Sequence, residues 1–198
     1  EILGNRYKKV KIYEDPEIVK FGKTKILFLP WINRENGEKS MELINSNEAS
    51  VVMGHLELNG FKMYKNSFCH HGMNHTIFNG YDLVMTGHYH HKSTVGNIAY
   101  LGSTYEITWA DYNDPRGFHI FDTNTLDLEY YQNSHKIFHK IIYNDTGVES
   151  FEKISKDFSF CKNSYVKVLV ESKNNPYFFD KFIDSIQLHE PFDLSIIE

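Results

Sequence analysis

The stretch of sequence that decides the fold is YDLVMTGHYH, residues 81–90. Its first part is a short apolar run that ends at a glycine, which is typical of a strand buried in a sheet. Two earlier stretches have the same character, KILFLP at residues 25–30 and SVVMG at residues 50–54, and residues 38–44 between them are a plausible helix. Such alternation predicts an α/β fold whose strands are buried on both faces by helices.

Histidines follow two of these predicted strands directly. His55 comes after Gly54, and His88 and His90 come after Gly87. Side chains at positions i and i+2 of an extended chain project to the same side, so His88 and His90 can face one site. The carboxyl ends of strands are also where open α/β sheets place their ligands. We therefore predict that these three histidines are metal ligands.

Chance has to be weighed against this prediction, because the chain contains 11 histidines. An isolated histidine is more often an ordinary surface or core residue than a ligand. We interpret four of them in this way: His119, His135, His139 and His189. The group formed by Cys69, His70, His71 and the nearby His75 lacks the second ligand pair of a zinc site, so we interpret it as a loop from which His71 could reach the metal site.

Composition and charge leave the function open but argue against several classes. A net charge of −5 and a pI near 6.1 disfavour a protein that coats nucleic acid through a basic surface. Enzymes that meet phosphates through bound cations remain compatible with this charge. The sequence has no apolar run near the ~20 residues of a membrane helix. Its two widely separated cysteines make a disulfide framework improbable, so we expect a reducing cytoplasm.

The second half of the chain has a different pattern. Consecutive strands are predicted at residues 98–102, 117–122 and 126–130. They are joined by turns such as NDPRG at residues 113–117. We expect a boundary after residue 133, so that residues 1–133 form the first domain.

The remaining residues, 134–198, are expected to form a small α+β unit. Its predicted strands lie at residues 137–143, 165–171 and 193–197, with helical segments at residues 150–156 and 177–188.

Hydrolytic sites with two metal ions need hard carboxylate ligands besides imidazoles. Asp82, which we expect to be buried in the strand before His88, and Asp111 are the nearby acids with a claim to this role. Neither stands in an Asp-x-His or Gly-Asp-x-x-Asp context. The sequence thus predicts an imidazole-rich site whose carboxylates are missing.

Further motifs surround these histidines. They are LPW at residues 29–31, GHLELNGF at 54–61, YLGS at 100–103 and NDPRGF at 113–118. In this order, and together with GHYH at residues 87–90, they resemble the SbcD-type DNA repair nucleases among the calcineurin-like metallophosphoesterases, most of all those of T-even phages. The resemblance is specific from about residue 7 to residue 122 and fainter beyond it.

The resemblance implies a four-layer α/β/β/α sandwich followed by a small capping domain that helps to recognise DNA. This chain would be the C-terminal part of the sandwich with an incomplete capping domain. The implied activity is metal-dependent exonuclease and endonuclease cleavage of DNA with two Mn²⁺ ions, Mg²⁺ being the alternative. His55 and His88 match ligands of one ion, and His90 matches a ligand of the other.

The resemblance also implies partners and a setting. The partners would be DNA, a second copy of the subunit and an SMC-like coiled-coil ATPase. The process would be recombination and double-strand-break repair in the cytoplasm of a bacterial or phage-infected cell.

The sequence departs from the family in one respect. The Asp-x-His, Gly-Asp-x-x-Asp and Gly-Asn-His-Asp motifs are absent, and Gly4-Asn5-Arg6 is no substitute because neither His nor Asp follows it. We therefore expect the catalytic residues upstream of Glu1. The chain alone should bind Mn²⁺ weakly and show no nuclease activity, because a hard ion without its bridging carboxylate loses most of its attraction to the site.

Four residues are weaker candidates for contacts to the substrate. Gly102 and Ser103 form a predicted tight loop, although such turns between strands are common. Lys136 and Lys140 share one face of either a strand or a helix and would offer a short basic strip, with solvated surface lysines as the ordinary alternative. The alternative functions are a phosphatase or cyclic-nucleotide phosphodiesterase, and a non-catalytic scaffold that docks the ATPase.

Overall fold

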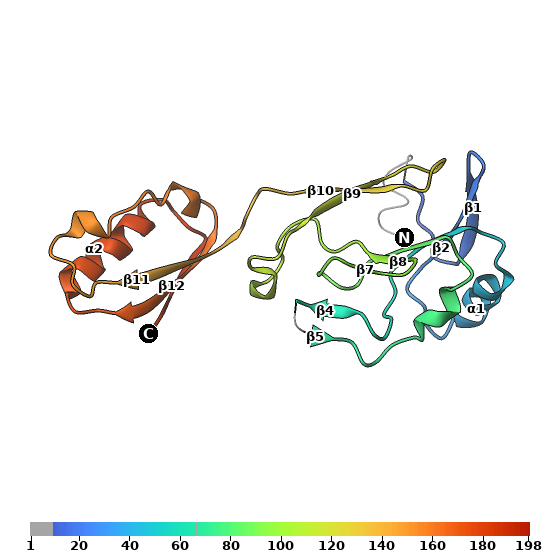
Figure 1. Cartoon of the computed structure of the whole chain (residues 1–198), viewed down its shortest axis with the longest axis horizontal. Helices are drawn as coiled ribbons and strands as arrows, with labels where there is room; N and C mark the ends of the chain where they lie inside the picture. Colours follow the sequence, from blue (N-terminus) through green and yellow to red (C-terminus); the bar gives the residue numbers. More distant parts are fainter. Residues whose placement is uncertain (1–9, 66) are drawn as a thin grey trace. The chain divides into compact units, whose positions relative to one another are not determined.

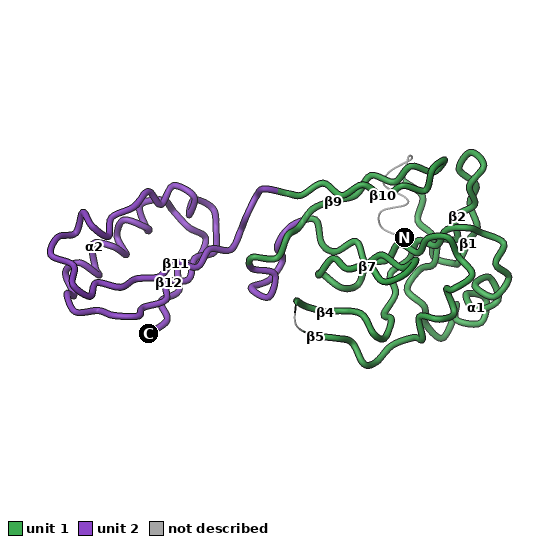
Figure 2. The backbone as a smooth tube through the Cα atoms, in the orientation of Figure 1, with its two compact units in different colours: residues 1–104, 113–133 green, residues 105–112, 134–198 purple. Residues whose placement is uncertain are grey.

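The computed structural model describes residues 10–65 and 67–198, so the Gly4-Asn5-Arg6 stretch lies outside the described residues. The chain divides into two compact units (Figure 2). Unit 1 runs to Thr104 and also contains Asn113–Asn133. Unit 2 is made of Tyr105–Tyr112 and Ser134–Glu198.

One short segment, residues 105–112, leaves unit 1 and packs within unit 2. The Glu106 carboxylate accepts hydrogen bonds from the backbone N–H groups of Ile137 at 2.7 Å and Phe138 at 3.0 Å. The ring of Trp109 packs on the ring of Phe138 with a centroid distance of 4.8 Å. The sequence pattern places this segment in the first domain, and the structure corrects that prediction. Its hydrogen bonds join residues 31 and 32 positions apart, which a local pattern does not report.

The main sheet of unit 1 has the strand order β1-β2-β3-β6-β8-β7 (Figure 1). Its strands, in chain order, are Glu17–Phe21 (β1), Thr24–Leu29 (β2), Val51–Gly54 (β3), Leu83–Thr86 (β6), Ser93–Val95 (β7) and Ile98–Tyr100 (β8). β2, β3, β6 and β8 pair in parallel, whereas β1 and β7 pair antiparallel at the edges. The predicted α/β class is thus confirmed at the level of a mixed α/β unit with a largely parallel sheet.

One face of this sheet is covered by the helix α1, Gly37–Ser46. Leu27, Val52 and Val84 point to this side and are fully buried in one apolar cluster with Ile44 of the helix. Burial of each such side chain contributes roughly 1.5–3 kcal/mol, which is why the predicted helix settles on the strands. The link from β3 to β6 carries the remaining small elements of this region, Lys62–Tyr64 (β4), Ser67–Phe68 (β5) and the 3-10 helix His75–Phe78 (η1).

The opposite face is covered by a β-hairpin, formed by Gly117–Phe121 (β9) and Leu128–Gln132 (β10). Its side chains Phe121 and Leu128 pack on Ile26, Val51 and Met85 of the sheet. Two-sided burial of the strands predicts helices on both faces. That expectation is wrong for this face, because the apolar pattern of a strand reports burial and not the kind of element that provides it.

Unit 2 contains a parallel sheet with the order β11-β12-β13. Its elements are Phe138–Asn144 (β11), Tyr165–Ser172 (β12), Asp193–Ile197 (β13), the helix Pro176–Gln187 (α2) and the 3-10 helices Trp109–Asp111 (η2), Phe151–Lys153 (η3) and Ser159–Cys161 (η4). Phe179, Phe182 and Ile186 of α2 are buried against Val166 and Val168 of the central strand. The helical segment expected at residues 150–156 is only the short turn η3.

The carboxylate of Asp145 ties the end of β11 to the start of α2. It accepts hydrogen bonds from the backbone N–H groups of Asn174 and Asn175, both at 2.7 Å, and from the Tyr143 hydroxyl at 3.0 Å. Burial opposes ionisation of this group, but the hydrogen bonds outweigh burial and lower the pKa of Asp145 below its ordinary value. The ionised carboxylate therefore stabilises the folded unit.

We predict that Asp145→Asn lowers the melting temperature of unit 2 near neutral pH. Because the folded-state pKa lies below the unfolded one, this contribution is fully present above the ordinary carboxyl pKa and is lost as the pH falls through the folded-state value. Thermal scans at several pH values should show the deficit of the variant shrinking in acid. Asp184→Asn, a change at an exposed position of α2, is the control. A deficit that does not depend on pH would contradict this account.

Candidate functional site

Three rings meet at the carboxyl edge of the main sheet. Trp31 follows β2, His55 follows β3 and His88 follows β6. The register pairs Leu29 with Gly54 and Gly54 with Thr86, so the three strands end level with one another. The ring centroids of His55 and His88 are 5.4 Å apart, and the Trp31 ring lies 5.7 Å from His55 and 5.2 Å from His88.

The backbone beside this ring cluster is tightly constrained. A Cβ atom on Gly87 would lie 2.9 Å from Nδ1 of His55, so the glycine is needed for the close approach of the two chain segments. The next residue, His88, has φ of +87°, a left-handed backbone conformation that residues other than glycine rarely adopt. Strain of this kind persists only where the surrounding structure imposes it, and it concentrates at functional sites.

The electrostatic setting favours a neutral His55. Partial burial lowers its pKa, and the neighbouring His88 lowers it further. Neutral imidazole is the form that coordinates metal ions. A cavity of about 190 Å³ lies beside the ring and is lined by Trp31, His55 and Glu57 among others. His55 therefore presents an imidazole that favours the neutral form at the rim of a small cavity.

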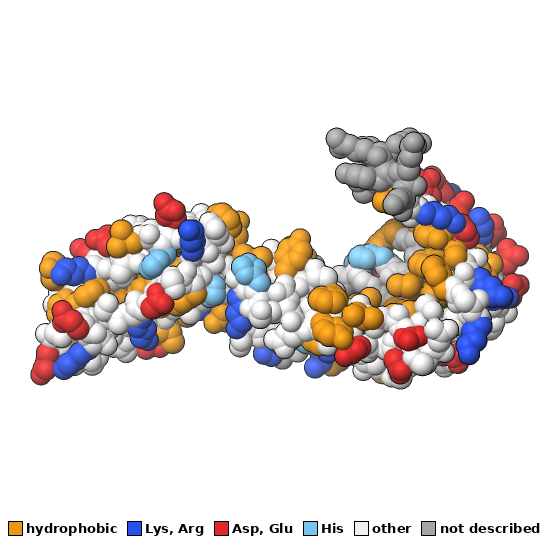
Figure 3. Space-filling view, turned by 90° about the horizontal axis from the view of Figure 1, so that it is seen from above, with side chains coloured by type: hydrophobic (Ala, Val, Ile, Leu, Met, Phe, Trp, Pro, Cys, Tyr) orange, Lys and Arg blue, Asp and Glu red, His pale blue; other side chains and the backbone are white. Residues whose placement is uncertain are grey.

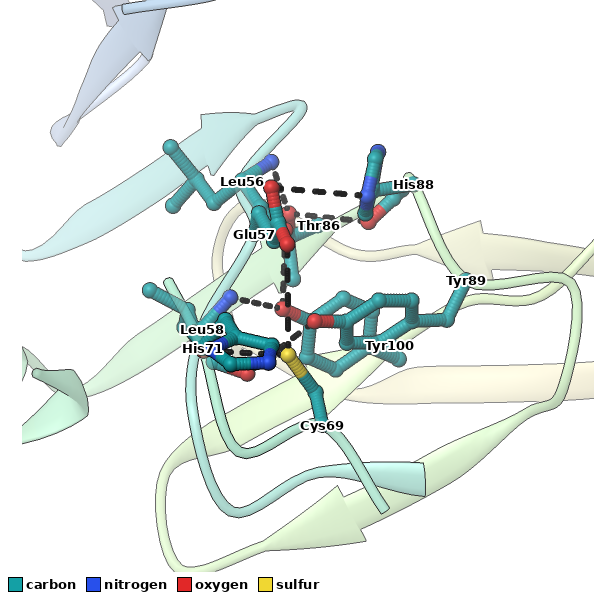
Figure 4. A network of polar contacts seen from close by, with 10 residues as sticks. Leu56, Glu57, Leu58, Cys69, His71, Thr86, His88, Tyr89 and Tyr100 are labelled. Atoms are coloured by element: carbon teal, nitrogen blue, oxygen red, sulfur yellow. Dashed lines mark hydrogen bonds and ion pairs between the residues drawn. The ribbon is translucent and has the colours of Figure 1, made fainter. Parts of the chain in front are cut away.

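Hydroxyl groups hold the loop that follows His55 (Figure 4). The Tyr100 hydroxyl donates to the carbonyl oxygen of Leu56 at 2.8 Å and accepts from the N–H of Leu58 at 3.0 Å. The Thr86 hydroxyl accepts from the N–H of Leu56 at 2.9 Å, and the Tyr89 hydroxyl donates to the carbonyl of Leu58 at 3.2 Å. Burial is the main reason why the pKa values of both tyrosines are raised, so both stay protonated and able to donate.

Glu57 lies between these anchored residues and was missed by the sequence reasoning. Its Oε2 is 4.0 Å from Nε2 of His88, and the side chains point toward one another in Figure 4. The signal for it was an acid two positions after His55, which has the same spacing as the pair His88 and His90.

The backbone of His90 is held by two neighbours. Its carbonyl oxygen accepts hydrogen bonds from the N–H of Ser103 at 3.1 Å and from the guanidinium of Arg116. A Cβ atom on Gly102 would lie 2.9 Å from the same oxygen, and Gly102 has φ of +74°. His88 and His90 both line a cavity of about 180 Å³. Gly102 and Ser103 thus support the histidine loop, and their contact with a substrate stays a prediction.

A buried ion pair explains the NDPRG turn. Oδ2 of Asp114 accepts hydrogen bonds from Nη2 of Arg116 at 2.9 Å and from Nδ1 of His91 at 2.8 Å. The side chains of Asp114 and Arg116 are 7% and 4% exposed. Arg116 also donates to the Ser103 hydroxyl at 3.2 Å. The turn therefore braces the loop that carries His88 and His90.

The acids named from the sequence are Asp82 in unit 1 and Asp111 in unit 2. Asp82 is exposed, and it precedes β6, whereas His88 follows the other end of that strand. The expectation that it is buried was wrong, because it lies just before the apolar strand begins. Asp111 is fully buried in unit 2, where its Oδ2 accepts from the N–H groups of Ile107 and Thr108. In the part of the chain that the structure describes, no three His, Cys, Asp or Glu side chains are gathered to hold a metal ion.

The other residues considered in the sequence are Lys136, Lys140 and the loop around Cys69. Lys136 and Lys140 are exposed in unit 2, and the Lys140 ammonium lies 4.6 Å from the centre of the Tyr112 ring. Cys69 is buried, and its thiol donates to the carbonyl oxygen of His71 at 3.0 Å, which is a contact within the loop. The ring nitrogens of His55 and His88 fit a divalent ion in kind, but as a partial set.

Fold and site together define an α/β protein with histidines at the carboxyl ends of adjacent parallel strands. No family model matches the chain. It is 34% identical over 201 aligned residues to exonuclease subunit 1 of Enterobacteria phage T4, an alignment that covers 99% of this chain and 57% of that protein. It is 25% identical over 161 residues to the SbcD subunit of the SbcCD nuclease of Staphylococcus epidermidis, covering 78% of this chain and 40% of that protein.

The chain is thus related to the SbcD-type nuclease subunits and to the phage subunit, and it spans about half the length of these two relatives. Within the described residues, no helix combines the length and the apolar character that crossing a membrane requires.

We predict that Asp114→Asn lowers the free energy of unfolding of unit 1 by about 3–5 kcal/mol, because the buried guanidinium loses the carboxylate beside it. Urea unfolding followed by tryptophan fluorescence in a Trp109→Phe background would report unit 1, since Trp31 is then the remaining tryptophan. Glu17→Gln removes the exposed ion pair with Lys11 in the same unit and should cost less than about 1 kcal/mol. Equal effects of the two changes would contradict the structural role of Asp114.

Proposed function

We propose that this chain belongs to a metal-dependent DNA nuclease subunit that hydrolyses phosphodiester bonds with two divalent ions. The observation that carries the proposal is the meeting of His55 and His88 at one sheet edge in a chain that aligns over 99% of its length with a phage exonuclease subunit. Histidines at strand ends occur in many classes of metal-binding protein. Among these classes, the alignment with the phage exonuclease subunit favours the nucleases.

His55 and His88 are proposed to hold one ion and His90 to contribute to the second. Mn²⁺ is the proposed metal, with Mg²⁺ as the alternative. Ions bound in such sites activate water and stabilise charge on the phosphate oxygens. The constrained backbone at Gly87 and His88 supports the role of these residues, because ligands must be held in place before the ion binds.

The remaining ligands belong, by the resemblance, to motifs that these 198 residues do not contain. We propose that unit 1 is the C-terminal part of a four-layer sandwich and unit 2 a capping domain. The proposed partners are DNA, a second copy and an SMC-like ATPase, as one relative is named a subunit of the SbcCD nuclease. The proposed setting is the cytoplasm of a bacterial or phage-infected cell.

We predict that His88→Ala in the complete subunit reduces Mn²⁺-dependent hydrolysis of DNA by more than about 100-fold, because loss of a mere supporting partner of a ligand already costs 10–100-fold. Assays on linear duplex and single-stranded DNA, with p-nitrophenyl phosphate and a cyclic nucleotide in parallel, would measure it. His189→Ala is the control, since this histidine is interpreted as ordinary. Preference for the small phosphoesters would favour a phosphatase or phosphodiesterase, and metal-independent binding without any hydrolysis would favour a scaffold.

We predict that Lys136→Glu combined with Lys140→Glu weakens duplex binding by the complete subunit and flattens its salt dependence by roughly 0.9 in slope per lost phosphate contact. On the face drawn in Figure 3, acidic and basic side chains are interspersed among the described residues, so this face has no continuous basic surface. Lys156→Glu with Lys162→Glu makes the same charge change at other exposed positions of unit 2. Equal effects of the two double variants would remove the strip from the mechanism.

A further inference from the structure

Glu57 has an exposed side chain on an unusually well-held backbone. Its neighbours Leu56 and Leu58 are 2% and 0% exposed, whereas the Glu57 side chain is 40% exposed. The peptide groups on both sides are bonded to buried hydroxyls, two of these bonds being made by Tyr100. The loop therefore presents one acid outward from between two buried anchors.

A second strand of chain closes on the same residue. The carbonyl oxygen of Glu57 accepts a hydrogen bond from the N–H of Met73 at 2.9 Å. A Cβ atom on Gly72 would lie 2.5 Å from that oxygen, and Gly72 has φ of +89°. This packing leaves room for no other residue type at position 72 without movement of the backbone. The backbone at position 57 is thus held from two sides, which fixes the point from which the Glu57 side chain extends.

The side chain held in this way meets His88. Nε2 of His88 lies 4.0 Å from Oε2 of Glu57, a separation that a side-chain rotation or one bridging water converts into a hydrogen bond. The His88 backbone is itself held at φ of +87°. The constrained backbones at Glu57 and His88 thus place the carboxylate near the imidazole.

We propose that Glu57 is a positioning residue for His88. Its carboxylate accepts a hydrogen bond from the Nε2–H of the neutral imidazole. This bond fixes the orientation of the ring and leaves Nδ1 unprotonated, so that its lone pair can coordinate a metal ion. A carboxylate behind a ligating histidine sets its tautomer and raises its basicity. The inference deepens the proposed function, since it concerns one of the proposed ligands, and Tyr100 supports it by holding the Glu57 loop.

The tautomer of His88 is the direct readout, and it needs no metal. Nitrogen-15 NMR of the chain at a pH where the imidazoles are neutral should show His88 protonated at Nε2. Glu57→Ala should shift it toward a mixture of tautomers, whereas Glu57→Gln, which keeps an acceptor oxygen, should retain the wild-type form. Glu42→Ala, at an exposed position of α1, is the matched control. An unchanged tautomer in Glu57→Ala overturns the inference.

Metal affinity separates this inference from the proposed function. In the complete subunit, Glu57→Ala should weaken Mn²⁺ binding about 10- to 100-fold, measured from the signal of free Mn²⁺ by electron paramagnetic resonance. His88→Ala should weaken it further. If His88→Ala has no effect, the proposed metal site fails. If His88→Ala weakens binding and Glu57→Ala does not, the positioning role of Glu57 alone fails.

Discussion

The parallel register of β2, β3 and β6 is the constraint on which the candidate site depends. Leu29, Gly54 and Thr86 lie level across the three strands, and the ring-bearing residues follow immediately. A slip of one residue would turn the buried side chains of a strand to the other face of the sheet. The free energy gained by burying the apolar layers therefore also fixes where His55 and His88 stand. The core thereby positions the site, and its residue Tyr89 packs against the His88 ring with a centroid distance of 5.0 Å.

Buried polar side chains hold the loops that follow these strands. Tyr100 and Thr86 hold the loop after His55, and the ion pair of Asp114 with Arg116 holds the loop after His88. These groups are buried, so each hydrogen bond that is lost leaves a desolvated partner behind. Buried hydrogen bonds thus fix the conformation of these loops, whereas exposed loops usually lack such support. Side chains held in this way suit the metal site that we propose.

The ammonium groups of two lysines in unit 2 also pack against aromatic rings. The ammonium of Lys140 lies over Tyr112, and that of Lys167 lies 4.1 Å from the centre of the Trp109 ring. Both rings come from the segment 105–112, and the two lysines are cross-strand neighbours on β11 and β12. Cation–π contacts at exposed positions contribute about 0.5–1 kcal/mol. A charge swap at Lys140 would thus change packing in unit 2 as well as any contact with DNA.

The sequence by itself determined the buried strands, the helix α1 and the placement of His55 and His88 at strand ends, because apolar periodicity and flanking glycines are local. Tertiary structure alone decided that a hairpin covers the second face, that residues 105–112 pack in unit 2 and that Asp82 is exposed. It also decided that Glu57 stands beside His88, 31 positions away in sequence. A periodic pattern reports whether a residue is buried in its own element. Which distant side chain it meets depends on the register and connections of the whole sheet.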